Sequence, residues 1–351
     1  MMEPFFILSK KKVLEQYNRL IDLADAVSFS AKCNPLVAKI LLDESRASVT
    51  CSFYELSNLN PQPERTTIYL QSQSREEIRH LLDKGYSSFV VDNQTDLNSL
   101  LKSATNKEIT LFLRMRLKEH SIHTEKHFVF GFKTNQILSL IPELKRSKQI
   151  AKIGIHVHRK TQNMSEWSHF DEIKESLGES LNEIDLINIG GGIPCRYKNF
   201  NFSDETLNNI FKKILSMRKS FNLLGIKMIL EPGRYIAAPS VKLKTAITNI
   251  YNQNIILNAS VYNSMPDIII LNLKPLIEEE FSEENPQWRY TIKGCTPCSL
   301  DIFRYSAYLK NPKINDQITF LNAGAYNFYT EFCYLPKLKT KIVESFERFE
   351  K

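Results

Sequence analysis

The chain has 351 residues, more than one typical domain, and its 42% hydrophobic and 24% charged residues supply enough apolar material for a packed core. The formal net charge of +7 comes from 46 basic and 39 acidic residues spread along the chain, without the basic block typical of nucleic-acid binding. No apolar stretch is long enough to span a bilayer, and the opening MMEPFFILSKKK lacks the basic region and long apolar run of a secretory leader. The six scattered cysteines form no zinc motif, so we expect a cytoplasmic protein with free thiols, no membrane segment and no metal.

Short apolar runs alternate with longer amphipathic stretches as far as Tyr235, which indicates parallel strands joined by helices. Eight strand–helix units in succession are what a (β/α)8 barrel requires, whereas a doubly wound sheet seldom needs so many. The predicted helices include 75–84, 95–103, 136–146, 167–177 and 204–221. The predicted strands are Val27–Lys32, Ser48–Phe53, Thr67–Ser72, Ser88–Asp92, Ile109–Leu117, Ile153–His158, Asp185–Ile189 and Lys227–Leu230.

After Tyr235 the pattern changes to short β-rich runs separated by polar turns, which indicates a second, mainly β domain. The sequence therefore predicts a barrel over residues 20–235 and a β domain over residues 236–351, with the strand-like N-terminal segment 1–19 joining the β domain. The predicted strands of this domain are Val241–Ile247, Ile268–Leu273, Tyr290–Lys293 and Gln317–Leu321.

Residues whose side chains could take part in catalysis or ligand binding gather where the barrel strands end. Active sites of barrels are built at the carboxyl ends of the strands. Lys32 would end the first strand and His158 the sixth, a run of three glycines (190–192) follows the seventh, and Glu231 and Arg234 follow the eighth. Each has an ordinary explanation when taken singly: a solvated lysine, a core histidine, and two turns, the second held by an ion pair. Their common position favours a shared site.

The functional interpretation assigns each group a different chemistry. The apolar flanks of Lys32 would bury its amine and favour a covalent bond with an aldehyde cofactor. The glycine run would let backbone N–H groups converge on a phosphate. Glu231 is suited to holding a pyridine nitrogen protonated, and Arg234 to meeting a phosphate or a carboxylate. Strand alternation puts His156 and His158 on one side, which we predict is the barrel interior.

Over nearly its whole length the chain resembles the fold-type III, alanine-racemase-like pyridoxal-phosphate decarboxylases. This family includes ornithine, diaminopimelate and carboxynorspermidine decarboxylases and several relatives from siderophore pathways. The segments that carry the resemblance, in the family's order and spacing, are SAKCNP at 30–35, VTCS at 49–52 through Glu55, IHVH at 155–158 through Gln162, GGG at 190–192, EPGRY at 231–235 and AGAY at 323–326.

The resemblance implies a homodimeric amino-acid decarboxylase that uses pyridoxal 5'-phosphate. It implies that Lys32 bonds the cofactor, that His158 stacks on its ring and that Glu231 contacts the pyridine nitrogen. The remaining cofactor contacts that it implies are Gly190, Gly191, Gly192, Gly233, Arg234 and Tyr326, with Thr161 in place of a serine usual in the family.

The chain departs from the family in a loop that reads GCTPCSLD at 294–301. Family members place a catalytic cysteine four residues before the closing aspartate, Asp301, and Pro297 occupies that position here. We take Cys298, one residue later, as the proton donor and as a substrate contact together with Asp301, with Cys295 as the alternative thiol. In the family this loop crosses to the barrel of the partner subunit.

Further departures concern the substrate. Asn188 stands where an aspartate is usual, and Arg159 and Lys160 replace small residues. In the loop at 294–301 no acid follows the usual cysteine position, so simple diamino acids such as ornithine lose support. The basic pair favours a carboxylated or conjugated substrate, such as a carboxylated polyamine or a siderophore-type precursor.

Two alternatives use the same cofactor. Alanine-type racemases hold the ring nitrogen with an arginine, so Glu231 argues against a racemase. Pyridoxal-phosphate proteins without catalytic activity are smaller single barrels, so the second domain argues against this class. Release of CO2 would separate a decarboxylase from both.

Overall fold

The structure is a computed structural model that describes residues 2–117, 130–281, 285–327 and 331–349. The chain divides into two compact units. The first, which we call the barrel unit, comprises Tyr17–Pro194 and Ser203–Gly233. The second, the β unit, comprises Met1–Gln16, Cys195–Phe202 and Arg234–Lys351, so that 195–202 belongs to it although this segment lies inside the range 20–235.

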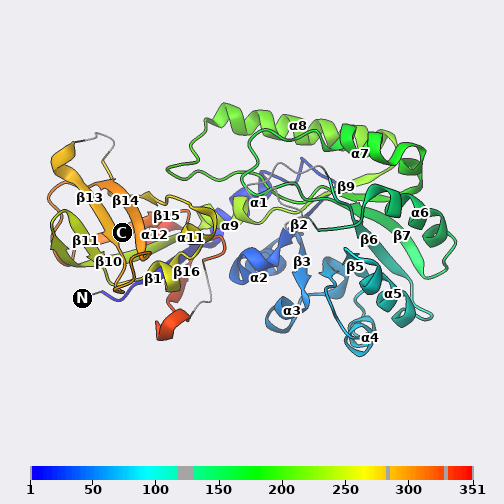
Figure 1. Cartoon of the computed structure of the whole chain (residues 1–351), viewed down its shortest axis with the longest axis horizontal. Coiled ribbons are helices and arrows are strands. Elements are labelled where there is room, and N and C mark those ends of the chain that lie inside the picture. Colours follow the sequence, from blue (N-terminus) through cyan, green and yellow to red (C-terminus); the bar gives the residue numbers. More distant parts are fainter. Residues whose placement is uncertain (1, 118–129, 282–284, 328–330, 350–351) are drawn as a thin grey trace. The chain divides into compact units, whose positions relative to one another are not determined.

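Eight parallel strands close a barrel in chain order, which confirms the predicted (β/α)8 architecture (Figure 1). The last strand pairs with the first through Ile229 and Ala26, and this pairing completes the ring. The strands are β2 (Ala26–Ser30), β3 (Ser48–Ser52), β4 (Thr66–Tyr69), β5 (Ser88–Val91), β6 (Ile109–Arg114), β7 (Ile150–His156), β8 (Leu186–Asn188) and β9 (Lys227–Leu230).

The barrel strands are apolar because helices cover the barrel outside while side chains fill its interior. Phe112 of β6 lies opposite Gly154 of β7 and is almost completely buried. A Cβ atom on residue 154 would lie 2.4 Å from the Phe112 ring. The glycine on one strand therefore makes room for the aromatic ring on its neighbour.

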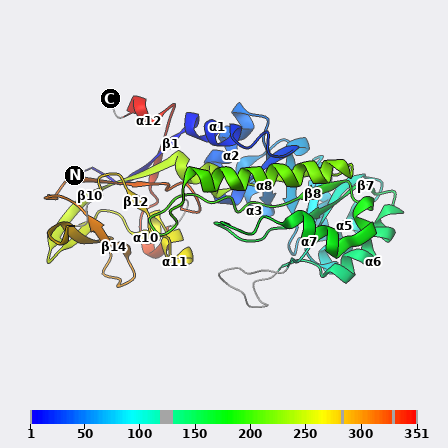
Figure 2. The same ribbon diagram turned by 90° about the horizontal axis from the view of Figure 1, so that it is seen from above.

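The helices of the barrel unit alternate with its strands, and α8 is its longest helix (Figure 2). The Asn34 side chain accepts hydrogen bonds from the backbone N–H groups of Leu36 and Val37 and so starts the first helix after β2. The helices are α2 (Pro35–Glu44), α3 (Phe53–Leu59), α4 (Arg75–Asp83), α5 (Gln94–Ser103), α6 (Thr134–Lys145), α7 (His169–Leu177) and α8 (Asp204–Leu223), and α1 (Lys10–Asn18) precedes them across the boundary between the units.

The β unit contains a mixed sheet in which the N-terminal strand β1 (Phe5–Ser9) pairs with β10 on one side and β16 on the other. From one edge the main path runs β12-β15-β10-β11-β13-β14. Its strands are β10 (Val241–Tyr251), β11 (Asn254–Leu257), β12 (Leu276–Ile277), β13 (Arg289–Lys293), β14 (Ile302–Tyr308), β15 (Gln317–Leu321) and β16 (Lys339–Val343). The predicted second, mainly β part of the fold is confirmed.

One predicted strand, Ile268–Leu273, is wrong. The segment forms helix α11 (Asp267–Leu271), which begins after Pro266 and ends at Asn272 in a left-handed conformation. A short continuous apolar run does not distinguish a strand from a helix by its period. The other short helices of this unit are α9 (Arg234–Ala237), α10 (Val261–Ser264) and α12 (Phe346–Phe349). Within the described part of the chain, no helix combines the length and the apolar character that a bilayer span demands.

Candidate active site

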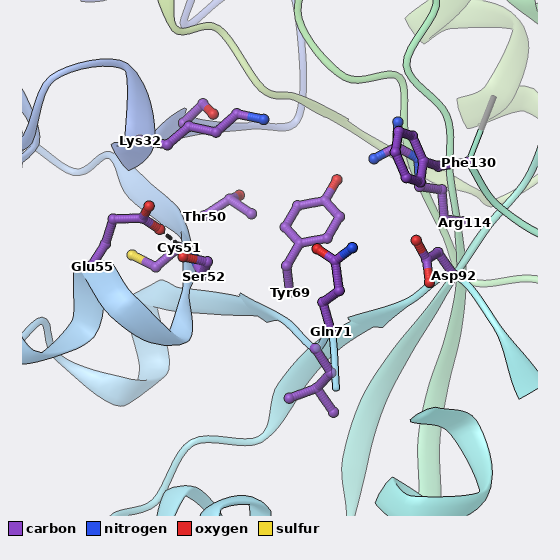
Figure 3. Close-up of a pocket in the computed structure, with 12 residues that line it drawn as sticks. Lys32, Thr50, Cys51, Ser52, Glu55, Tyr69, Gln71, Asp92, Arg114 and Phe130 are labelled. Atoms are coloured by element: carbon purple, nitrogen blue, oxygen red, sulfur yellow. Dashed lines mark hydrogen bonds between the residues drawn. The ribbon is translucent and has the colours of Figure 1, made fainter. Parts of the chain in front are cut away.

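The carboxyl ends of barrel strands β2 to β6 surround a pocket of about 270 Å³. Lys32, Tyr69 and Arg114 extend into the same space from three different segments (Figure 3). The lining residues are Ser30, Lys32, Thr50, Cys51, Ser52, Glu55, Tyr69, Leu70, Gln71, Asp92, Arg114 and Phe130. This is the end of the barrel at which the sequence predicted a site.

Lys32 lies in this pocket, but the expected burial of its side chain is wrong. Strand β2 ends at Ser30, and Lys32 occupies a 3-10 turn between the strand and α2. Its neighbours Ala31 and Cys33 are buried, whereas Lys32 itself is exposed. The apolar flanks therefore anchor the turn and leave the amine accessible to a ligand.

Glu231 follows β9 and is buried at the same end of the barrel. Asn188 donates a hydrogen bond of 2.9 Å to its carboxylate, and Nε2 of His156 lies 3.4 Å from the same oxygen. Burial by itself raises the pKa of Glu231, but the hydrogen bonds from His156 and Asn188 and the nearby positive charge together outweigh it, so the pKa is lowered. The arrangement thus keeps an ionised carboxylate inside the barrel.

The replacement of the usual aspartate by Asn188 has a physical reason in this arrangement. The amide nitrogen of Asn188 serves the carboxylate of Glu231, while its oxygen accepts a hydrogen bond of 2.9 Å from the Gly190 N–H. A carboxylate at position 188 would repel Glu231 instead. Asn188 therefore links the carboxylate to the glycine turn.

The two histidines of the β7 segment have different surroundings, because β7 ends at His156 and not at the predicted His158. His156 is buried and contacts the Tyr69 hydroxyl. His158 is partly buried, and its Nδ1 accepts a hydrogen bond of 3.3 Å from the Gly191 N–H. Burial, reinforced by the charges of Arg114 and Lys32, lowers the pKa of His158 to about 3, so its ring is neutral at physiological pH.

The glycines at 190–192 are required by close packing. Added Cβ atoms at these three positions would lie 2.6, 2.5 and 2.3 Å from the carbonyl oxygens of Val157, Glu231 and Lys160, respectively. Gly190 and Gly192 also have φ angles of +69° and +97°, a region that favours glycine. The N–H groups of Gly190 and Gly191 bind Asn188 and His158, so the turn holds the site residues together as well as offering a surface free of side chains.

The sequence predicted an excess of positive charge at the basic pair Arg159 and Lys160, and this prediction is wrong. Arg159 forms an ion pair with Glu172, and Lys160 forms one with Glu166. Glu166 also lies 3.6 Å from Arg159. Two carboxylates therefore balance the two cations. Thr161, which follows them, is partly buried.

In the β unit the structure brings together Arg234 and Tyr326, two of the predicted phosphate contacts. The Arg234 guanidinium is 4% exposed and lies 5.2 Å from the centre of the Tyr326 ring. It forms an ion pair with Asp267 and a hydrogen bond of 3.1 Å with the Tyr197 hydroxyl. The arginine is thus held in an ion pair, as the ordinary interpretation of this motif had it, with Asp267 as the partner.

The cysteine loop also belongs to the β unit. Cys295 and Cys298 are both exposed, whereas Asp301 is buried and accepts hydrogen bonds from backbone groups of Val261 and Thr296. A Cβ atom on Gly294 would lie 2.1 Å from the Asp301 carboxylate. These contacts favour a role for Asp301 in shaping the loop.

Several residues of the site did not emerge from the sequence, although a signal existed for some. Tyr69 and Arg114 end β4 and β6, so the rule that found Lys32 could have found them. Burial, together with the negative charge of Glu231, raises the pKa of Tyr69 and keeps it protonated, while the charge of Arg114 and a hydrogen bond with it oppose this shift. Tyr262, which contacts Cys298, gives no signal because it lies 36 residues away along the chain.

Residues 11–238 match the family model of the pyridoxal-binding domain of pyridoxal-dependent decarboxylases. A probable ornithine decarboxylase of Dictyostelium discoideum is 22% identical, and the match covers 95% of this chain and 78% of that protein. Antizyme inhibitor 1 of Pongo abelii is 21% identical, with 93% and 78% covered. The crystal structure of Helicobacter pylori diaminopimelate decarboxylase complexed with L-lysine shares the fold, with a TM-score of 0.82, 19% identity, and 98% of this chain and 92% of that chain covered.

Proposed function

This chain belongs to the family of pyridoxal-dependent decarboxylases, and from that premise we propose that it releases CO2 from an amino acid with pyridoxal 5'-phosphate as its cofactor. The observation that carries the proposal is the accessible amine of Lys32 in a barrel pocket whose nearby charges include the ionised carboxylate of Glu231. Because the relatives include a protein named as an inhibitor, family membership alone does not establish catalysis.

The residues of the barrel unit fit this cofactor. Lys32 offers an amine to an aldehyde, His158 offers the face of a neutral ring, and Glu231 offers a buried carboxylate to a pyridine nitrogen. When bound, pyridoxal phosphate supplies an electron sink for the carbanion that loss of CO2 leaves. Glu231 would hold the proton at the ring nitrogen, because its lowered pKa keeps it ionised beside that nitrogen.

For the phosphate we propose the glycine turn and its surroundings. At Gly190, Gly191 and Gly192 the packing leaves no space for a side chain, and Gly233 has so little room that a Cβ atom would lie 3.0 Å from Cys33. Thr161 would add a hydroxyl. We also propose Arg234 and Tyr326, which contact each other within the β unit, as residues that bind the cofactor.

We propose Cys298 as the group that returns a proton to the α-carbon, with Asp301 shaping its loop. Of the two thiols of this loop, Cys298 has the lowered pKa, chiefly because the Tyr262 hydroxyl hydrogen-bonds it. Cys295 is an exposed residue, but partial shielding of its thiol from water and the charge of Asp301 raise its pKa. We also propose a homodimer in which this loop serves the partner's barrel.

The substrate is proposed only as an amino acid. The balanced charges of Arg159 and Lys160 remove the argument for a carboxylated side chain. The absence of an acid after Pro297 still disfavours simple diamino acids.

The test is CO2 release from a panel of amino acids, together with the cofactor spectrum of Lys32→Ala. We expect the wild-type protein to absorb visible light, and borohydride reduction with peptide mapping to label Lys32. Lys32→Ala should lose both the label and the absorbance band that arises from the covalent bond to the lysine, whereas the control Lys39→Ala, at an exposed lysine of α2, should keep both. A label on another lysine would refute the site. Bound cofactor without CO2 release from any amino acid would refute the decarboxylase.

A further inference from the structure

Tyr262 and Cys298 form a side-chain pair in the β unit. The Tyr262 hydroxyl lies 2.9 Å from the Cys298 sulfur. The Tyr262 ring also stacks on Phe332, with centroids 5.0 Å apart and 30° between the planes. This stacking orients the ring and therefore the direction in which the hydroxyl points.

One buried carboxylate joins the two segments that carry this pair. The Asp301 side chain accepts a hydrogen bond of 2.8 Å from the N–H of Val261, the residue before Tyr262. Its other oxygen accepts hydrogen bonds from the Thr296 N–H at 3.0 Å and from the Thr296 hydroxyl at 2.7 Å. Asp301 is 1% exposed, so these bonds are shielded from water. Helix α10 and the cysteine loop are thereby held in one arrangement.

We infer that Tyr262 is a positioning residue for Cys298, which holds the thiol in place and donates a hydrogen bond to its ionised form. The inference deepens the proposed function, since it rests on Cys298 as the proton donor. A phenol is a good donor to a thiolate, and a donor to the charged form of an acid favours that form.

The groups around the thiol support this inference. Tyr262 from α10 and the backbone N–H of Leu300 lower the pKa of Cys298, while the Asp301 carboxylate acts in the opposite direction. Cys295 shares the loop, but its pKa is shifted upward, because its thiol is partly shielded from water and Asp301 is negatively charged. The pKa values of the two thiols of this loop are thus shifted in opposite directions.

The experiment measures alkylation of Cys298 by iodoacetamide as a function of pH, in the holoenzyme with Cys295→Ser as the background. The thiolate is the reactive form, so the rate follows the ionised fraction. Tyr262→Phe keeps the ring and its stacking and removes only the hydroxyl. We expect the rate at pH 7 to fall roughly threefold or more, and the two curves to converge above about pH 10, where the thiol of either protein is ionised.

Tyr305→Phe is the matched control, because this tyrosine of β14 is 66% exposed in the same unit, and it should leave the curve unchanged. Phe332→Ala is a second variant, which keeps the Tyr262 hydroxyl but removes the stacking that orients it. This variant should shift the pH curve of alkylation in the same direction as Tyr262→Phe. An unshifted curve in both Tyr262→Phe and Phe332→Ala overturns the inference, whatever the activity. A shifted curve together with a fully active Cys298→Ala supports the inference and refutes Cys298 as the proton donor.

Discussion

At the scale of single residues, the site depends on a carboxylate that is buried and yet ionised. Glu231 keeps its charge because Asn188 and His156 donate hydrogen bonds to it inside the barrel. A neutral amide in its place would preserve the shape of the site and remove the charge. The charge, not the volume of the side chain, is what would hold a proton on a pyridine nitrogen.

We therefore expect Glu231→Gln to keep the cofactor but to lower turnover by roughly 10²- to 10⁴-fold. The measurements are steady-state CO2 release and the cofactor absorbance of the purified variant. Glu179→Gln, at an exposed position after α7, is the control and should match the wild type. Turnover of Glu231→Gln within a few-fold of wild type would assign control of the ring to another group.

A second residue-scale prediction concerns stability and pH. His169 of α7 is 1% exposed, and burial together with Arg159 lowers its pKa to about 4. Between that value and the unfolded value of about 6.5, the unfolded chain binds a proton that the folded protein excludes. His169 therefore contributes stability above about pH 6.5 that is lost as the pH falls, by at most about 1.4 kcal/mol per pH unit.

Urea unfolding at pH 7 and pH 5 checks this dependence. His169→Gln should lose part of the acid-induced drop in the free energy of unfolding. The control His80→Gln, at an exposed position of α4, should retain the drop. Equal pH slopes for His169→Gln and the wild type would contradict the assignment.

The sequence reveals which reactive residues meet at the site, but it does not reveal which residues form ion pairs with them. Lys32, Glu231 and the glycine turn were predictable because strand ends of a barrel meet at one face. The ion pairs of Arg159 with Glu172 and of Arg234 with Asp267 were not, because they join residues that only tertiary packing brings together. For the same reason the predicted excess of positive charge was wrong.

At the scale of elements, the glycine turn after β8 sets how closely the loops after β7, β8 and β9 approach one another. We expect Gly192→Ala to weaken cofactor binding and to lower the free energy of unfolding by about 1–3 kcal/mol, since a Cβ atom would lie 2.3 Å from the Lys160 carbonyl oxygen at a φ of +97°. Gly225→Ala is the matched control. It also has a positive φ, of +78°, but no atom lies within 4 Å of the added Cβ.

Cofactor titration by absorbance and urea unfolding measure the two effects. In Gly225→Ala the free energy of unfolding should fall by only about 1 kcal/mol, the cost of placing an alanine in the left-handed region, and cofactor affinity should be unchanged. Equal losses in both variants would show that backbone conformation, and not the close approach to Lys160, governs the turn.

The barrel was predictable element by element, and the β unit only in part. Strands that are buried on both faces have nearly continuous apolar sequences, which makes them easy to predict. Strand β9, for example, has the predicted bounds. The strands β14 and β16 were missed because each mixes charged residues with apolar ones, as IFRYSAY and KTKIV show. Such strands face water on one side, so their composition resembles that of a loop. The proposed domain boundary after Tyr235 stays a prediction.

At the scale of the whole molecule, the proposed dimer makes a prediction that needs no further structure. Lys32 belongs to the barrel unit and Cys298 to the β unit. If the cysteine loop serves the partner's barrel, mixing inactive Lys32→Ala and Cys298→Ala subunits should restore some CO2 release. One of the two sites in such a heterodimer would contain both intact residues.

Native mass spectrometry of the mixture shows whether the subunits exchange. Lys32→Ala mixed with wild type is the control for dilution of active sites. Exchange without any recovery of CO2 release would mean that lysine and thiol act within one subunit.

The position of the first strand affects how this protein folds during synthesis and whether its parts can be produced as separate fragments. Strand β1 lies between β10 and β16, so Phe5 pairs with Lys244 on one side and with Lys339 on the other. During translation the apolar FFILS segment emerges before both of its partner strands and has no neighbour until the ribosome has passed β10. A chain arrested before Val241 would carry an unpaired apolar strand, which invites aggregation. Conversely, a gene fragment that encodes only 236–351 would produce a sheet without its inner strand, and grafting the first nine residues ahead of β10 would be needed to complete it.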